Sequence, residues 1–157
     1  MLIMKVKLQY LIDEMNMQFE GMNTYLNRMT GEIISVSEEN LRTVEEENSI
    51  EHLPEWQQEE LEEAFDIIII NFDNYEELPT KYEINEYDMI EDFCYGLCDG
   101  RNKDILLTSI QGKGAFRRFK DHILQLGMDK EWYSYRHECY KELAIEWCKE
   151  HGVKWVE

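Results

Sequence analysis

The stretch from Ser109 to His122 constrains the fold most strongly, because two glycines in it separate two patterns of helical apolar spacing. Gly112 follows the first pattern and Gly114 precedes the second. The apolar positions are Ile105, Leu106 and Ile110 before the glycines, and Phe116, Phe119, Ile123 and Leu126 after them. This spacing predicts a short helix, a Gly-Lys-Gly turn and a second helix that ends at Gly127.

The same turn is the basic part of an acidic chain. Residues 111–120 contain four cations and no acid, whereas the whole chain has 34 acidic and 16 basic residues and a net charge of −18. Cations at a helix start oppose the macrodipole, so a negative group should lie opposite Lys113, Arg117 and Arg118. That group is either an internal carboxylate or a bound phosphate or other anion, and the sequence leaves both readings open.

The distribution of charge limits the classes of partner. Residues 1–100 hold 25 acids and 5 bases, and residues 101–157 hold 9 acids and 11 bases. The acidic part argues against nucleic acid or an anionic membrane as the main partner, and favours a solvated face or a basic protein partner. No apolar run is long enough to span a membrane, and the first residues lack the order of a signal peptide. We therefore expect a cytoplasmic protein with reduced cysteines.

Local patterns predict a mostly helical α+β fold in one domain, with a small N-terminal β-hairpin and a compact C-terminal helical half. The hairpin covers residues 24–36 and turns at Thr30-Gly31. A helix follows from about Glu38 to Glu47, with Ser35 and Ser37 as competing caps. Residues 48–53 resemble a linker. The domain therefore spans 1–157, with a division into 1–48 and 54–157 as the alternative.

Further helices are predicted along the rest of the chain. The first helix begins near Leu8 and extends through Phe19, where Gly21 follows. Another runs from Pro54 to about Ile70 with Leu61, Phe65, Ile68 and Phe72 along one face, although the four isoleucines 67–70 also suit a short buried strand. Asn85 should cap a helix, and Asp129 should cap the long last helix that stops at Gly152.

Other candidate sites are weaker. Cys94 and Cys98 share a helix face, but their C-x₃-C spacing differs from zinc-binding C-x₂-C pairs, so we expect no metal and no cofactor. The four histidines are scattered, and no residue is singled out as catalytic. Arg136 lies one turn from Trp132, where its guanidinium can stack on the indole. It either forms a structural pair with a carboxylate or joins Lys113 and Arg117 in an anion pocket.

Several short motifs carry a resemblance to a known family. The motifs are Tyr25-Leu26-Asn27, Thr30-Gly31-Glu32, Leu78-Pro79-Thr80, Gly112 to Asp121, Glu131-Trp132-Tyr133 with Arg136, and Ala144-Ile145-Glu146-Trp147. Together they resemble a bacterial group, uncharacterised protein family 0158, over nearly the whole chain. The resemblance implies a small cytoplasmic bacterial protein without an assigned reaction, and it supplies no catalytic residues.

These observations favour a non-catalytic binding or regulatory protein over an enzyme. The expected site is the basic turn, which would bind an anionic ligand or an acidic partner. Its residues are Gly112, Lys113, Gly114, Arg117, Arg118 and Arg136. An enzyme acting on a phosphorylated small molecule is the alternative. A nucleic-acid binder with helix-turn-helix geometry is a third reading, which the net charge opposes. The many aromatic residues suit a core or a dimer face.

Overall fold

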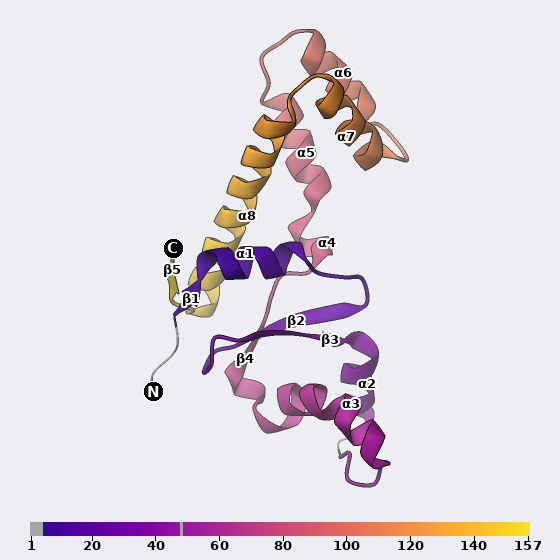
Figure 1. Ribbon diagram of the computed structural model, residues 1–157, viewed down its shortest axis with the longest axis vertical. Coiled ribbons are helices and arrows are strands. Elements are labelled where there is room, and N and C mark those ends of the chain that lie inside the picture. The colour runs from indigo at the N-terminus through magenta and orange to yellow at the C-terminus, as the bar shows by residue number, and fades with distance from the viewer. Residues whose placement is uncertain (1–4, 48) are drawn as a thin grey trace. The chain divides into compact units, whose positions relative to one another are not determined.

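The computed structural model describes residues 5–47 and 49–157 and confirms a mostly helical α+β fold. The chain forms two compact units (Figure 1). The first contains the residues up to Glu83 together with Leu143–Glu157, and the second is Ile84–Glu142. The segment 49–53, which the sequence suggests as a linker, lies within the first unit. The single-domain organisation stays a prediction.

The first unit is built on a three-stranded antiparallel sheet. Strands β2 (Met22–Asn27) and β3 (Ile33–Ser37) form the predicted hairpin, in which Tyr25 pairs with Ile34. Gly31 has a φ of +76° in the turn, a backbone conformation that suits glycine. Strand β4 (Tyr75–Glu77) pairs with the other edge of β2 and has no counterpart in the sequence-based prediction.

Helices cover both faces of this sheet (Figure 1). Helix α1 (Leu8–Asn16) lies on one side, and α2 (Glu38–Glu47) and α3 (Glu55–Phe65) lie on the other. The Asn40 backbone N–H donates to Ser37 Oγ at 3.1 Å, so Ser37 rather than Ser35 caps α2. The core beside α2 and α3 is aliphatic and consists of Val36, Leu41, Val44, Leu61, Ala64 and Ile67.

Helices α1 and α3 end several residues earlier than predicted. Helix α1 stops at Asn16, and Phe19 is 71% exposed instead of extending the apolar face. Helix α3 gives way to a π-helical turn, η1 (Asp66–Ile70), and a 3₁₀ turn, η2 (Phe72–Asn74). The wider π turn changes the register, so Ile67 enters the core in place of Ile68, and Phe72 is exposed. The alternative buried strand at 67–70 is not formed either.

The two ends of the first unit meet in a short parallel pair. Strand β1 (Val6–Lys7) pairs with β5 (Trp155–Val156), which follows the end of the last helix. Gly152 has a φ of +64° directly after that helix, as its predicted role as a helix stop requires. This pairing joins residues almost 150 positions apart, which no local pattern predicts.

The second unit is helical. It contains α5 (Glu86–Tyr95), α6 (Arg101–Ser109), α7 (Ala115–Gln125) and residues 129–142 of α8 (Asp129–His151), and the short α4 (Lys81–Ile84) lies at its border. Asn85 caps α5 as predicted, since its side chain accepts from the Asp88 backbone N–H.

The core of the second unit is aromatic. Phe119 is fully buried, and its ring centroid lies 5.0 Å from that of Trp132 and 6.2 Å from that of Phe93, both edge-on. Phe119, one of the apolar positions identified after the two glycines, is therefore buried against the last helix. Phe116 differs, because it is 45% exposed and contacts the Tyr87 ring edge. Only part of the predicted apolar face of α7 is buried.

Candidate functional site

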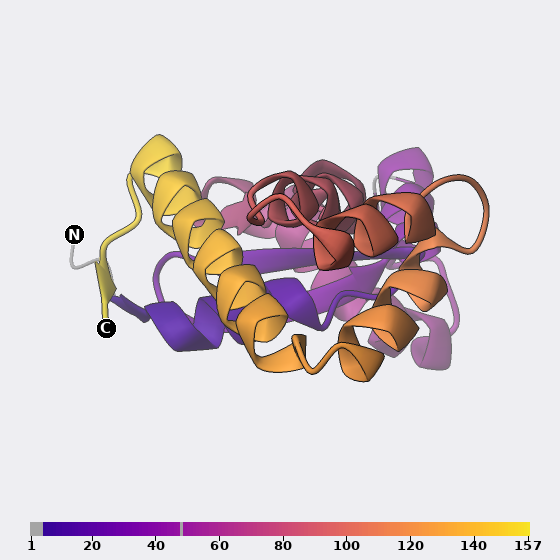
Figure 2. The same ribbon diagram turned by 90° about the horizontal axis from the view of Figure 1, so that it is seen from above.

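The turn between α6 and α7 projects from the edge of the second unit (Figure 2). Helix α6 ends at Ser109, slightly before the predicted end at Gly112. Gly112 and Gly114 have φ values of +74° and +78°, a region that L side chains rarely adopt. Gly114 is the residue before α7, so the helix begins without a side-chain cap.

Arg118 folds back over this turn. Its Nε donates to the Ser109 carbonyl at 2.9 Å, and its Nη atoms donate to the carbonyls of Gln111, Gly112 and Lys113. A Cβ on residue 114 would lie 3.0 Å from Arg118 Nη1, so glycine is also needed there for space. The negative ends of backbone carbonyl dipoles therefore lie opposite the Arg118 guanidinium.

Lys113 and Arg117 have a different environment. Both are exposed, and neither forms a salt bridge within residues 5–47 and 49–157. A hollow of 520 Å³ on the same unit is lined by Asp104, Ile105, Thr108, Ser109, Arg118 and His122. Lys113 and Arg117 are therefore exposed on a turn whose backbone is held in place by the hydrogen bonds of Arg118.

Arg136 belongs to a separate cluster. Its guanidinium forms an ion pair with Glu86 at the start of α5, and Tyr140 Oη donates to the same carboxylate at 2.7 Å. The guanidinium lies 4.6 Å from the centroid of the Tyr140 ring, which replaces the predicted stacking on Trp132. Burial and the neighbouring Glu86 raise the pKa of Tyr140. The structural Arg–carboxylate pair is the arrangement present.

The buried cysteines are poor nucleophiles. Burial raises the thiol pKa of Cys94 and of Cys148 to about 11, so both stay protonated at neutral pH. Cys98 is exposed, whereas Cys94 is in the core. Across the described part of the chain, no three His, Cys, Asp or Glu side chains are arranged to hold a metal ion.

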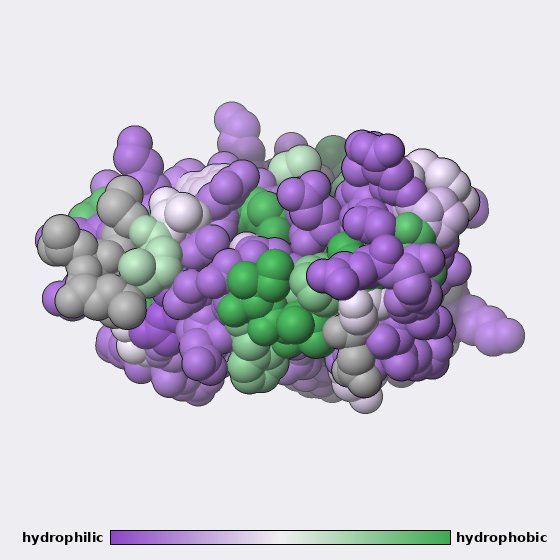
Figure 3. All heavy atoms as spheres, turned by 90° about the horizontal axis from the view of Figure 1, so that it is seen from below, coloured by the Kyte–Doolittle hydropathy of each residue, from purple (hydrophilic) through white to green (hydrophobic). Residues whose placement is uncertain are grey.

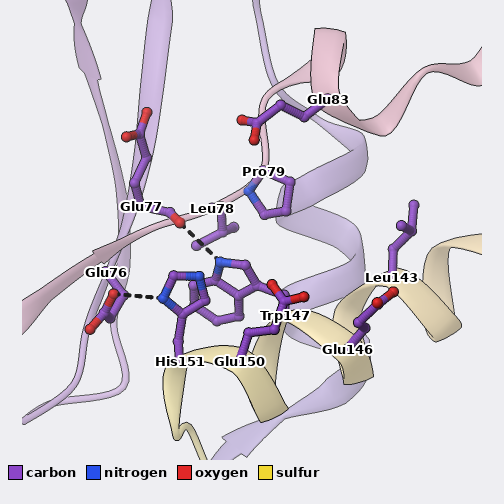
Figure 4. Close-up of a pocket in the computed structure, with 10 residues that line it drawn as sticks. All are labelled: Glu76, Glu77, Leu78, Pro79, Glu83, Leu143, Glu146, Trp147, Glu150 and His151. Atoms are coloured by element: carbon purple, nitrogen blue, oxygen red, sulfur yellow. Dashed lines mark hydrogen bonds and ion pairs between the residues drawn. The ribbon is translucent and has the colours of Figure 1, made fainter.

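The first unit contains an acidic hollow of 490 Å³ that the sequence analysis missed (Figure 4). It is lined by Glu76, Glu77, Leu78, Pro79, Glu83, Leu143, Glu146, Trp147, Glu150 and His151. The indole of Trp147 and the imidazole of His151 lie next to each other, with centroids 4.8 Å apart and ring planes tilted by 35°. Trp147 Nε1 donates to the Glu77 carbonyl at 3.0 Å, and His151 Nδ1 lies 2.9 Å from Glu76 Oε2.

The glutamates of this hollow affect one another. Partial burial and the nearby charge of Glu83 raise the pKa of Glu77, although its carboxylate also accepts a hydrogen bond from Asn23 Nδ2 at 2.9 Å. The i, i+4 spacing of Trp147 and His151 was a visible signal for one wall. The opposite wall could not be found in this way, because it depends on β4, which pairs with a strand fifty residues earlier.

The elements and sites described above define a mostly helical α+β protein with a basic turn on one unit and an acidic hollow on the other. The sequence profile described as "Uncharacterised protein family (UPF0158)" matches residues 1–157, so the chain belongs to this family. Searches of curated proteins and of solved structures found no match.

Within the described ranges, no helix combines the length and the apolar character that crossing a bilayer requires.

Proposed function

We propose that the protein is a non-catalytic binding or regulatory protein that uses the α6–α7 turn to bind an anionic ligand or an acidic partner. One observation carries this proposal: Lys113 and Arg117 are exposed and form no salt bridge within residues 5–47 and 49–157, although the chain contains 34 acids. What distinguishes this turn from other exposed cations is clustering, because residues 111–120 hold four cations and no acid in an otherwise acidic chain, and a concentration of one charge attracts a group of the opposite charge.

The local backbone supports the same proposal. Gly114 leaves the start of α7 without a side-chain cap, so N–H groups there can donate to an anion beside the two cations. Arg118 would hold the turn in shape through the carbonyls of Gln111, Gly112 and Lys113. Arg136 would support the unit through Glu86 and stay away from the ligand.

The test is the thermal midpoint in the presence of phosphate or sulfate. We expect the wild-type midpoint to rise and saturate with anion concentration, because a ligand that binds only the folded state stabilises it by mass action. Arg117→Ala should abolish the rise and leave the anion-free midpoint unchanged or slightly higher, since a repulsive charge near the positive helix end is removed. The matched control is Arg101→Ala, which removes an exposed cation from α6.

A clear loss of stability in Arg117→Ala, without an anion response in the wild type, would contradict the proposal. Fluorescence polarisation with labelled nucleotides, RNA and DNA would then extend the comparison to other anions. Saturable nucleotide binding accompanied by turnover would favour the enzyme alternative, and binding to DNA or RNA alone would favour the nucleic-acid reading.

A further inference from the structure

The segment between Arg42 and Lys81 is strongly acidic. Residues 43–80 contain 13 acids and no Lys or Arg. The same segment exposes large apolar side chains on the turns η1 and η2, where Ile69 is 41%, Ile70 62% and Phe72 66% exposed. These three exposed side chains lie within four residues of one another, and exposed apolar surface with a polar rim is typical of an interaction surface.

The π-helical turn is the reason for this exposure. An α-helix continuing from α3 would keep one face of the isoleucine run toward the core, but the wider turn places only Ile67 there. Ile68 packs partly against the core, and the last two isoleucines face outward. Folding of this unit therefore leaves Ile69, Ile70 and Phe72 without the burial that their side chains favour.

Hydrogen bonds that Asp66 accepts hold the turn in this shape. Its carboxylate accepts from Asn71 Nδ2 and from Tyr75 Oη, each at 2.6 Å. Its backbone carbonyl accepts from the Asn71 N–H at 2.8 Å, the bond that closes the π turn. The apolar residues that follow Asp66 are thus presented by a braced backbone, which lowers the entropy cost of binding.

We propose that Ile69, Ile70 and Phe72, here called the η patch, bind a basic amphipathic segment of another protein. Charge complementarity selects this occupant, because the patch lies in a segment with Glu62, Glu63 and Asp73 exposed and no cation from 43 to 80. Figure 3 views the face that carries α2, α3 and η1, and shows apolar surface ringed by hydrophilic residues. An apolar stripe flanked by Lys or Arg would match both properties.

The experiment uses the full chain and a fluorescein-labelled peptide of Leu and Lys at helical spacing. We expect saturable binding by fluorescence polarisation, and no binding of a matched peptide of Leu and Glu. Ile70→Ser/Phe72→Ser should weaken binding by about tenfold, whereas Phe19→Ser/Leu124→Ser should bind like the wild type. The control removes two side chains that are 71% and 63% exposed elsewhere. Both double variants keep the net charge of the protein, so a peptide that bound through charge alone would bind the two variants equally.

Three results would overturn the proposal. The first is the absence of peptide binding to the wild type, and the second is equal binding by the two double variants. The third is a wild-type dimer in size-exclusion chromatography that becomes a monomer in Ile70→Ser/Phe72→Ser, because a second copy would then cover the patch. If that variant does not fold, amide hydrogen exchange of the wild type decides. Peptide-induced protection of residues 66–74 supports the proposal, and protection only elsewhere overturns it.

Discussion

The two units use charge in opposite ways. The second unit, Ile84–Glu142, has 11 acids and 9 bases, a net charge of −2. The remaining residues hold 23 acids and 7 bases, a net charge of −16. The numbers of acids and bases in the second unit are almost equal, and two of its arginines act as structural donors: Arg118 donates to backbone carbonyls and Arg136 pairs with Glu86. The surplus acids of the first unit leave much of its surface without opposite charge.

The cores of the two units differ as well. The second unit packs edge-on aromatic rings, including Phe93, Phe119 and Trp132, whereas the sheet and helices of the first pack aliphatic side chains. A few large rings concentrate the packing energy, and many small aliphatic groups spread it. We infer that single substitutions have their largest effects in the second unit and that hydrogen-bonded turns matter more in the first.

The largest expected effect is at the aromatic core. Phe119→Ala should lower the free energy of unfolding by about 3–5 kcal/mol, because a fully buried ring that contacts Phe93 and Trp132 is removed. Phe116→Ala is the matched control on the same helix and should cost far less, since that ring is 45% exposed. Urea denaturation measures both. Equal losses would mean that α7 is not anchored through Phe119.

The next effect concerns the ion pair of the second unit. Glu86→Ala should cost about 1–3 kcal/mol, because it leaves the Arg136 guanidinium and Tyr140 Oη without a shared, partly buried acceptor. Asp99→Ala removes the almost fully exposed partner of Lys103 and should leave the urea midpoint unchanged within error. If the two variants are equally stable, the partly buried pair of Arg136 and Glu86 contributes no more to stability than the exposed pair of Lys103 and Asp99.

A smaller loss is expected at the π turn of the first unit. Asp66→Ala removes the acceptor for Asn71 and Tyr75 and should cost about 1–2 kcal/mol, with exposed Asp73→Ala as control. A second readout is the phenol titration followed by ultraviolet absorbance. Burial and Asp66 raise the pKa of Tyr75 to about 12, so it should fall toward its ordinary value in the variant. An unchanged titration would show that Asp66 does not contact Tyr75 in solution.

The smallest effect depends on pH and tests the acidic hollow. Because the pKa of Glu77 is raised in the folded protein, its folded form binds the proton more tightly, and stability falls as pH rises through the raised value. Glu77→Gln removes that loss, so its thermal midpoint should exceed the wild type at neutral pH and converge with it below about pH 4, where the unfolded carboxyl is also protonated. The gain should exceed that of Glu59→Gln on α3. Equal gains would indicate general charge relief alone.

Local patterns were sufficient for much of the fold. The hairpin, the α2 boundaries, the Asn85 cap and the stop at Gly152 follow from turn glycines, capping side chains and apolar periodicity, all of which act over a few residues. The same kind of pattern located the basic turn and the apolar position Phe119. The environments of the individual cations in the turn could not be predicted in this way, because Arg117 and Arg118 are adjacent in the sequence, yet Arg117 is exposed and Arg118 donates to backbone carbonyls.

The sequence by itself determined where most of the helices lie, where α2 and α8 stop, and that charge is divided unevenly along the chain. Tertiary structure alone decided the pairings of residues distant in sequence: β4 with β2, β1 with β5, and Arg136 with Glu86. It also decided that the isoleucine run forms a π turn with two exposed members. The physical reason is that periodicity and capping act over a few neighbouring residues. The partner of an edge strand or of a partly buried charge depends instead on which distant residues folding places next to it.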